Sequence, residues 1–160
     1  MRKTTIIVFF VIFILGCKAM TGVLPQPAST ATPEPQKTSL PFLAGDWQIT
    51  LHHSGGIMGL SRSIEVSSDG TYTVTDEISK QTKQGQLSKE ELDNLLKIAT
   101  SSQFSPNTEQ YGCADCFIYN IEILSDTKFS AQVDDVTVEA SGLEPLITNL
   151  REIMERELKQ

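Results

Sequence analysis

The sequence predicts an α+β domain in which a five-stranded, mainly antiparallel sheet carries two helices on one face, in the order βββαββα. Three observations support this prediction. Five segments of the chain alternate apolar and polar residues, which is the pattern of half-buried strands. Two other segments repeat apolar residues at helical spacing after a capping signal. A Ser-Ser-Asp-Gly turn joins two of the strands, which favours an antiparallel meander.

The first three strands are expected at residues 47–53, 60–66 and 71–78. In each of them most residues at every second position are apolar, so that one face of the sheet is largely apolar. The stretch 80–86, which reads KQTKQGQ, breaks this alternation. We therefore expect the meander to end before it.

A helix and two further strands are expected next. Ser88 and Glu91 form a capping box, in which each side chain satisfies a free backbone amide at the start of a helix. The apolar stripe of this helix consists of Leu92, Leu95, Leu96 and Ala99. The alternation returns over 117–123 and again over 129–133, which predicts the fourth and fifth strands.

The last part of the chain combines a phase change with a second helix. The pair Asp134-Asp135 shifts the alternation, which then continues to Val138 on the other parity and indicates a bulge or a corner. Ser141 and Glu144 form a second capping box. The apolar stripe of the closing helix consists of Leu143, Leu146, Ile147, Leu150 and Ile153.

The N-terminus resembles the signal of bacterial lipoproteins. Arg2 and Lys3 precede an apolar run, Ile6–Leu15, which spans about 15 Å as a helix and is too short to cross a bilayer. The run ends in Ile-Leu-Gly-Cys, which resembles the lipobox. The resemblance implies cleavage after Gly16 and acylation of Cys17, whose acyl chains would anchor the protein in a membrane. An ordinary signal peptide with a chance cysteine is the alternative.

The chain is expected to have three parts. Residues 1–16 form the lipoprotein signal peptide. Residues 17–41 form the lipidated cysteine and a tether rich in Pro, Ser and Thr, which holds five of the seven prolines. Residues 42–160 form a single α+β domain, expected to be monomeric and anchored in the cell envelope. In this domain 19 acidic residues outnumber 9 basic residues. The excess negative charge repels phosphate backbones, which excludes nucleic-acid binding.

Cys113 and Cys116 form a C-x-x-C motif in a chain that leaves the cytosol. A structural disulfide is favoured, because the motif leads into a strand rather than into the helix N-terminus where redox-active pairs lie. A zinc site of both thiols with His52 or His53 is the alternative. Adjacent strand residues point to opposite faces, so one histidine is expected half-buried and the other solvated. The sequence contains no G-x-S-x-G or H-E-x-x-H motif, so we expect no enzyme, no cofactor and no metal.

The segment between the first two strands is the candidate binding loop. It consists of Ser54, Gly55, Gly56, Ile57, Met58, Gly59 and Leu60. Its three glycines allow sharp turns and close approach to a partner, whereas Ile57 and Met58 are apolar residues in a loop expected to be exposed. A phosphate loop is disfavoured because no Lys-Ser/Thr pair or helix start follows. The alternative is a hairpin whose two apolar side chains fold back onto the core.

This loop, the Ser67–Gly70 turn, the helix opening LSKEE and the closing helix LEPLITNLREI resemble the emfourin family over Trp47–Met154. Emfourins are small bacterial inhibitors of thermolysin-like (M4) zinc metallopeptidases, with a similar SGG-x-x-G loop in an early hairpin. The resemblance implies that the loop occludes the active site of such a peptidase and presents Ile57 or Met58 to its apolar primed-side pocket. The lipobox, the tether and the C-x-x-C motif depart from the family and leave the target open.

A second interpretation is a non-catalytic envelope lipoprotein that binds a small apolar ligand or another envelope protein. The segment Leu43–Trp47, LAGDW, loosely resembles the G-x-W opening of lipocalin-like and META-type domains. A lipocalin barrel needs about eight strands, more than the sequence predicts. An enlarged apolar cavity would favour this interpretation, whereas a packed core with a protruding loop at 54–60 would favour the inhibitor.

Overall fold

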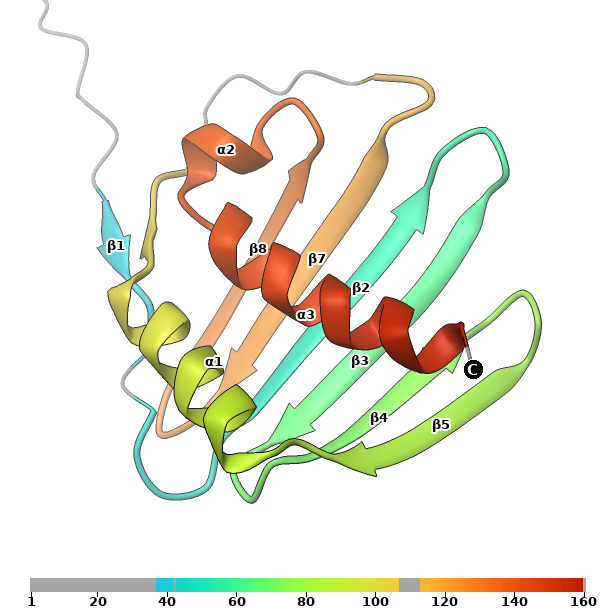
Figure 1. Cartoon of the computed structure of the whole chain (residues 1–160). Helices are drawn as coiled ribbons and strands as arrows, with labels where there is room; N and C mark the ends of the chain where they lie inside the picture. The colour runs from blue at the N-terminus through green and yellow to red at the C-terminus, as the bar shows by residue number, and fades with distance from the viewer. Residues whose placement is uncertain (1–36, 42, 107–112, 160) are drawn as a thin grey trace, which may run out of the picture. The chain divides into compact units, whose positions relative to one another are not determined.

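A six-stranded antiparallel sheet forms the centre of the structure (Figure 1). The computed structural model describes residues 37–41, 43–106 and 113–159, so the predicted signal peptide, Cys17 and most of the tether lie outside the described residues. The order of strands across the sheet is β5-β4-β3-β2-β7-β8. These strands are β2 (Gln48–Gly55), β3 (Leu60–Ser67), β4 (Thr71–Asp76), β5 (Gln81–Gln86), β7 (Phe117–Leu124) and β8 (Lys128–Asp134).

Two helices, α1 (Lys89–Ser101) and α3 (Glu144–Leu158), lie on the same face of the sheet (Figure 1). α3 packs on β3 and β4 and also contacts α1. A short helix, α2 (Val138–Ser141), lies between β8 and α3 in the chain. The predicted fold class is confirmed: the fold is α+β, with a mainly antiparallel sheet and helices on one of its faces.

The alternation that predicted the strands also separates the two faces of the sheet. On β2, Ile49 and Leu51 are fully buried towards the helices, whereas His52 is exposed on the other face. Leu51 pairs with Ile64 of β3 and with Ile121 of β7, so apolar side chains of neighbouring strands form rows across the sheet. The helices add Leu95, Ala99, Leu146, Ile147, Leu150 and Met154 to this core. Each large side chain buried in this way contributes about 1.5–3 kcal/mol.

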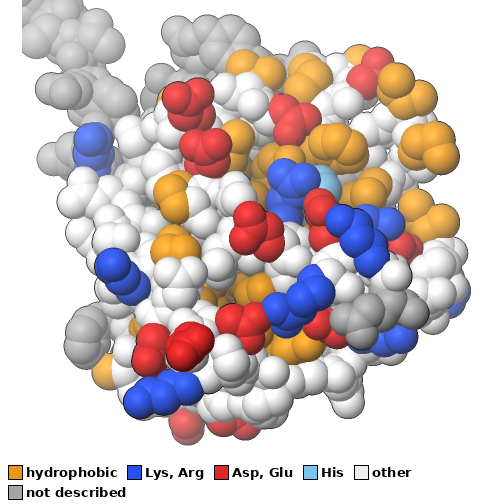
Figure 2. Space-filling model, in the orientation of Figure 1, with side chains coloured by type: hydrophobic (Ala, Val, Ile, Leu, Met, Phe, Trp, Pro, Cys, Tyr) orange, Lys and Arg blue, Asp and Glu red, His pale blue; other side chains and the backbone are white. Residues whose placement is uncertain are grey.

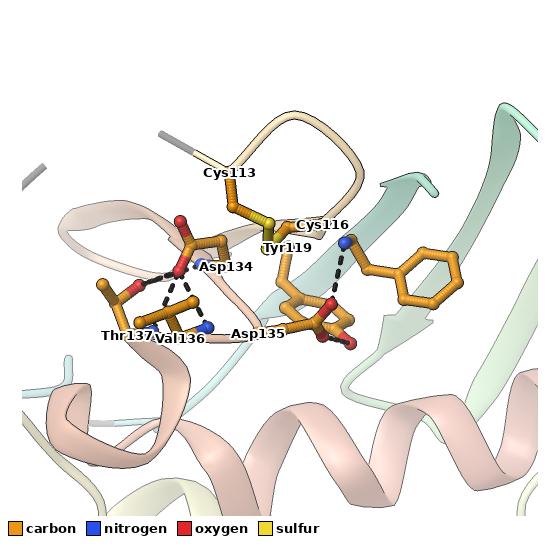
Figure 3. Close-up of a disulfide and its surroundings, with 8 residues drawn as sticks. Cys113, Cys116, Tyr119, Asp134, Asp135, Val136 and Thr137 are labelled. Atoms are coloured by element: carbon orange, nitrogen blue, oxygen red, sulfur yellow. Dashed lines mark hydrogen bonds between the residues drawn. A yellow bond between two sulfur atoms is a disulfide. The ribbon is translucent and has the colours of Figure 1, made fainter. Parts of the chain in front are cut away.

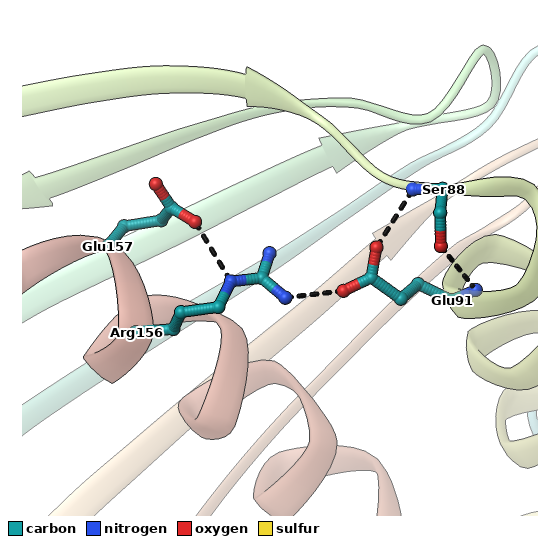
Figure 4. A network of polar contacts seen from close by, with 4 residues as sticks. All are labelled: Ser88, Glu91, Arg156 and Glu157. Atoms are coloured by element: carbon teal, nitrogen blue, oxygen red, sulfur yellow. Dashed lines mark hydrogen bonds and ion pairs between the residues drawn. The ribbon is translucent and has the colours of Figure 1, made fainter.

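The predicted capping box at the start of α1 is present (Figure 4). The Ser88 hydroxyl accepts a hydrogen bond from the Glu91 amide at 3.2 Å, and the Glu91 carboxylate accepts one from the Ser88 amide at 2.8 Å. Arg156 of α3 pairs with the same carboxylate and, at 3.0 Å, with Glu157. Arg156, followed by the Ser88 contacts, lowers the pKa of Glu91 to about 2. The cap therefore also joins α1 to the last turns of α3.

The sheet has one strand more than the sequence predicts. The stretch Gln81–Gln86, expected outside the meander, is the edge strand β5 and pairs with β4 along its whole length. Its side chains are almost all exposed, so backbone hydrogen bonds rather than an apolar face hold it in place. A separate two-stranded sheet joins β1 (Thr38–Ser39), from the stretch expected to be tether, to β6 (Gln103–Phe104).

Two expectations about the chain after β8 are wrong. The strand ends at Asp134, whose carboxylate accepts a hydrogen bond from the Thr137 amide at 2.9 Å. The chain therefore turns into α2 and does not continue as a strand to Val138. Ser141 does not cap α3, because its hydroxyl donates to the Val138 carbonyl at 2.6 Å and accepts only from the Leu143 amide, before the helix begins, at 3.1 Å. α3 begins after Leu143 without a side-chain cap.

Candidate functional site

The β2–β3 turn carries the two most exposed large apolar side chains of the described residues. Ile57 is 88% exposed and Met58 is 91% exposed. Ser54 and Gly55 end β2, and Leu60 begins β3, so the two apolar residues occupy the tip of a hairpin. The tip lies at the end of the sheet where β7 begins (Figure 1). The alternative in which these side chains fold back onto the core is therefore wrong.

The glycines of the turn place its backbone close to its surroundings. Gly55, Gly56 and Gly59 have φ angles of 101°, 68° and 63°, which residues with a Cβ atom rarely adopt. The Gly59 amide donates to the Gly56 carbonyl at 2.9 Å and closes the turn. A Cβ on Gly55 would collide with the Cys116 carbonyl, and one on Gly56 would collide with the Phe117 ring. The turn is therefore packed against the start of β7.

A disulfide closes the segment against which the turn packs (Figure 3). Cys113 and Cys116 are bonded, with their Cα atoms 5.4 Å apart, which confirms the disulfide interpretation. The Gly56 amide donates to the Cys116 carbonyl at 3.1 Å. On the other side, the Phe117 amide donates to Asp135 Oδ2 at 2.9 Å. The end of the disulfide-bonded segment is therefore hydrogen-bonded to the hairpin through Cys116, and the next residue, Phe117, is hydrogen-bonded to Asp135 in the turn that follows β8.

Removing the disulfide is expected to loosen the hairpin at one point. In a Cys113→Ala/Cys116→Ala variant, the carbonyl that accepts from Gly56 loses its fixed position. We expect the Gly56 amide to exchange with solvent about fivefold faster, which corresponds to one hydrogen bond of about 1 kcal/mol. Hydrogen exchange followed by NMR measures this rate, and the Gly59 amide, bonded within the turn, is the internal control. Unchanged exchange at Gly56 would contradict this role of the disulfide.

Beneath the turn, His53 lies among aromatic rings on the helix-covered face of the sheet. Its ring stacks on Tyr119 and meets Phe117 edge-on, with centroid distances of 4.9 Å in both cases. His53 is 4% exposed, and its Nε2 atom has no hydrogen-bond partner. Burial, with smaller contributions from two nearby guanidinium groups, lowers the pKa of His53 to about 4. The prediction that the two histidines differ in burial is confirmed, because His52 is exposed.

Charged groups surround the next ring of this cluster. The Tyr119 hydroxyl donates to Asp135 Oδ1 at 2.9 Å, and the Arg151 guanidinium lies 5.6 Å from the centre of the Tyr119 ring. Burial and the hydrogen bond to Asp135 raise the pKa of Tyr119 to about 12. A surface pocket of about 220 Å³ is lined by Thr148, Arg151, Glu152 and Glu155. This lining is polar and charged, unlike the apolar cavity that binding of a small apolar ligand requires.

Sequence reasoning identified the turn but not the residues that support it. Asp135 accepts hydrogen bonds from both the Phe117 amide and the Tyr119 hydroxyl, each at 2.9 Å. The sequence signal at this position, a change of alternation, indicated only a bulge or a corner. Asp134 and Asp135 have separate roles: the first holds the following turn, and the second holds the start of β7 (Figure 3).

Within residues 37–41, 43–106 and 113–159, no three His, Cys, Asp or Glu side chains are placed to hold a metal ion. The two sulfur atoms of the zinc alternative are joined in the disulfide. None of the helices in those ranges has the length and apolar character needed to span a bilayer. Comparison of the chain with known protein families and with curated proteins finds no match.

Proposed function

We propose that this protein inhibits a thermolysin-like zinc metallopeptidase by inserting the tip of the β2–β3 turn into the active-site cleft. The observation that carries the proposal is the exposure of Ile57 and Met58, 88% and 91%, at the tip of a hairpin with a closed turn. Adjacent exposed apolar residues are typical of surfaces that a partner covers. The resemblance of the SGGIMGL segment to the emfourin loop supports the choice of this class of peptidase.

Inhibition in this proposal is occlusion, and the inhibitor contributes no catalytic group. Ile57 or Met58 fills the apolar primed-side pocket beside the zinc ion of the peptidase. Burying either side chain contributes about 1.5–3 kcal/mol. The narrow glycine backbone allows the turn to enter the cleft, and its fixed conformation limits the entropy lost on binding.

We further propose that acyl chains on Cys17 anchor the protein in a bacterial cell envelope, where it meets exported peptidases. The basic N-terminus, the short apolar run and the proline-rich tether support this anchoring. A Cys17→Ser variant is expected to move from the membrane fraction to the soluble fraction when cells are fractionated. A variant that stays in the membrane fraction would contradict the lipid anchor.

Titration of thermolysin with the full chain, purified in mild detergent under oxidising conditions, tests the inhibitory function. We expect tight inhibition that approaches one inhibitor molecule per peptidase molecule, measured as the residual rate of peptide hydrolysis. No inhibition at micromolar concentration would contradict the proposal. A chain boiled and reduced before the titration controls for effects of the detergent.

A further inference from the structure

Exposed apolar side chains gather at one end of the sheet. Among the described residues, the exposed large apolar side chains are Ile57, Met58, Ile78, Leu124 and Val136. All but Leu124 lie at the end of the sheet that carries the β2–β3 turn: Ile78 follows β4 and Val136 follows β8. In Figure 2, hydrophobic side chains gather over the same end, in the upper right of the view. Leu124 ends β7 and lies at the opposite end.

Backbone hydrogen bonds connect the turn of Ile78 to the hairpin. The Glu77 amide donates to the Ser61 carbonyl at 2.9 Å, which fixes the start of this turn against β3. Asp76 Oδ1 accepts from the Ile78 amide at 3.0 Å, and Asp76 Oδ2 accepts from Arg62 of β3 at 3.0 Å. The position of Ile78 relative to the hairpin is therefore set by contacts to β3.

The turn of Val136 is connected to the hairpin from the other side. The Val136 amide donates to Asp134 Oδ1 at 3.0 Å. The next carboxylate, Asp135, holds the Phe117 amide at 2.9 Å. The residue before Phe117, Cys116, accepts from the Gly56 amide at 3.1 Å. Hydrogen bonds made by neighbouring residues therefore connect the turn after β8 to the start of β7, and the end of the disulfide-bonded segment to the β2–β3 turn.

The two apolar side chains at the hairpin tip are more exposed than the two in the neighbouring turns. Ile57 and Met58 in the middle are 88% and 91% exposed, whereas Ile78 and Val136 on the two sides are 60% and 56% exposed. The strand order places the hairpin tip between the turn of Ile78 and the turn of Val136. A folded protein whose cleft takes the tip would therefore meet one of these side chains on each side of it. The excess of acidic over basic residues in the chain, a net charge of −7, disfavours an anionic bilayer.

We propose that Ile78 and Val136 are two further contact sites, so that the partner is a folded protein whose cleft takes the hairpin tip and whose two rims contact these side chains. This inference rests on the proposed function and extends it from one turn to three. It assigns the cleft of the metallopeptidase an apolar contact on each rim. The interface centre is then the hairpin tip, and Ile78 and Val136 exclude water at its edge.

A double variant, Ile78→Ser/Val136→Ser, tests this inference against thermolysin. We expect the inhibition constant of the full chain to rise about 30-fold, because two apolar contacts are lost. The matched control is Leu124→Ser, which removes an exposed apolar side chain at the other end of the sheet and is expected to change inhibition less than twofold. Thermal unfolding of each variant shows that the fold is kept.

The outcomes separate this inference from the proposed function. Wild-type inhibition together with an unchanged inhibition constant for the double variant would overturn the three-turn interface and leave the hairpin as the inhibitory site. Absence of inhibition by the wild-type chain would overturn both. A bilayer as the occupant is tested in chains that also carry Cys17→Ser, with vesicles of phosphatidylcholine. Vesicle binding that the serine substitutions remove, with inhibition unchanged, would assign the two side chains to lipid and overturn the inference.

Discussion

Replacing Ile57 and Met58 together with aspartate is expected to abolish inhibition, with a rise of the inhibition constant of about 1,000-fold or more. Each of these side chains contributes about 1.5–3 kcal/mol when it is buried in a pocket. A carboxylate brought into the same apolar pocket adds a desolvation cost. The inhibition constant is measured for the wild-type and variant full chains against the same peptidase, at one pH and one ionic strength.

The same variant is expected to fold as the wild type does. Ile57 and Met58 are 88% and 91% exposed, so their replacement removes few contacts within the fold, and thermal unfolding should be unchanged. Leu124→Asp is the matched control, because it adds a carboxylate at an exposed apolar position of the opposite sheet end. Full inhibition by the Ile57→Asp/Met58→Asp variant would place the inhibitory site elsewhere, with residues 134–139 as the next region to test.

Acidification from about pH 6.5 to about pH 4 is expected to destabilise the protein by up to about 3 kcal/mol through His53 alone. Burial, with Arg151 and Arg62 adding to it and Asp135 and Glu155 opposing it, lowers the folded-state pKa to about 4 from the usual 6.5. Between these values the unfolded chain binds a proton that the folded protein does not bind. The free energy of unfolding therefore decreases as the pH is lowered through this window. The total decrease is about 1.4 kcal/mol per unit of pKa difference.

A His53→Phe variant is expected to lose this part of the pH dependence. Phenylalanine keeps an aromatic ring beside Tyr119 and removes the buried Nε2 atom that lacks a partner. Urea unfolding of the wild type and the variant, each at pH 7 and at pH 4.5, measures how much the free energy of unfolding of each protein changes between the two pH values. His52→Phe is the control, because His52 is exposed on the other face of the sheet. Equal pH dependence in the wild type and His53→Phe would show that His53 does not carry the effect.

Most of the sheet could be predicted because burial on one face leaves a period of two in the sequence. Residues 47–53, 60–66 and 117–123 alternate for this reason, and in the structure they form β2, β3 and β7, with β2 paired to both of the others. The start of α1 could be predicted because Ser88 and Glu91 satisfy each other's backbone amides without help from distant residues. Signals of this kind are local and are therefore readable in a single chain.

The elements that were missed depend on strand pairing and turn geometry that the apolar pattern does not record. β5 has no apolar face, and its polar residues form a strand because β4 offers a free edge. The pair Ser141 and Glu144 matches the spacing of a capping box, but Gly142 adopts a φ of 76° and ends α2 between them. The Ser141 hydroxyl donates back to Val138 and accepts from the Leu143 amide, so it reaches no amide within the closing helix. Pairing with β4 therefore decided β5, and the local turn at Gly142 decided the start of α3.

In the candidate site, too, the sequence indicated some features and not others. The apolar pair Ile57 and Met58 between glycines indicated a candidate binding loop, but the sequence left open whether these side chains fold back onto the core. The support of the turn by the Cys116 carbonyl joins residues about sixty positions apart, and no spacing rule indicates it. The approach of Ile78 and Val136 to the same end of the sheet also depends on strand order, which the sequence did not establish. A site made of several turns becomes visible only when the order of the strands is known.

The polar edge strand β5 affects how readily two copies of the protein can associate through their sheets. A free edge of a sheet presents unpaired amides and carbonyls, with which a strand of a second chain can pair. In β5 this edge is formed by Gln, Thr, Lys and Gly, with Lys83 in the middle of the strand and with side chains almost all in water. Such an edge gains little from pairing with a copy of itself. Pairing of two copies through β5 is therefore expected to be weak.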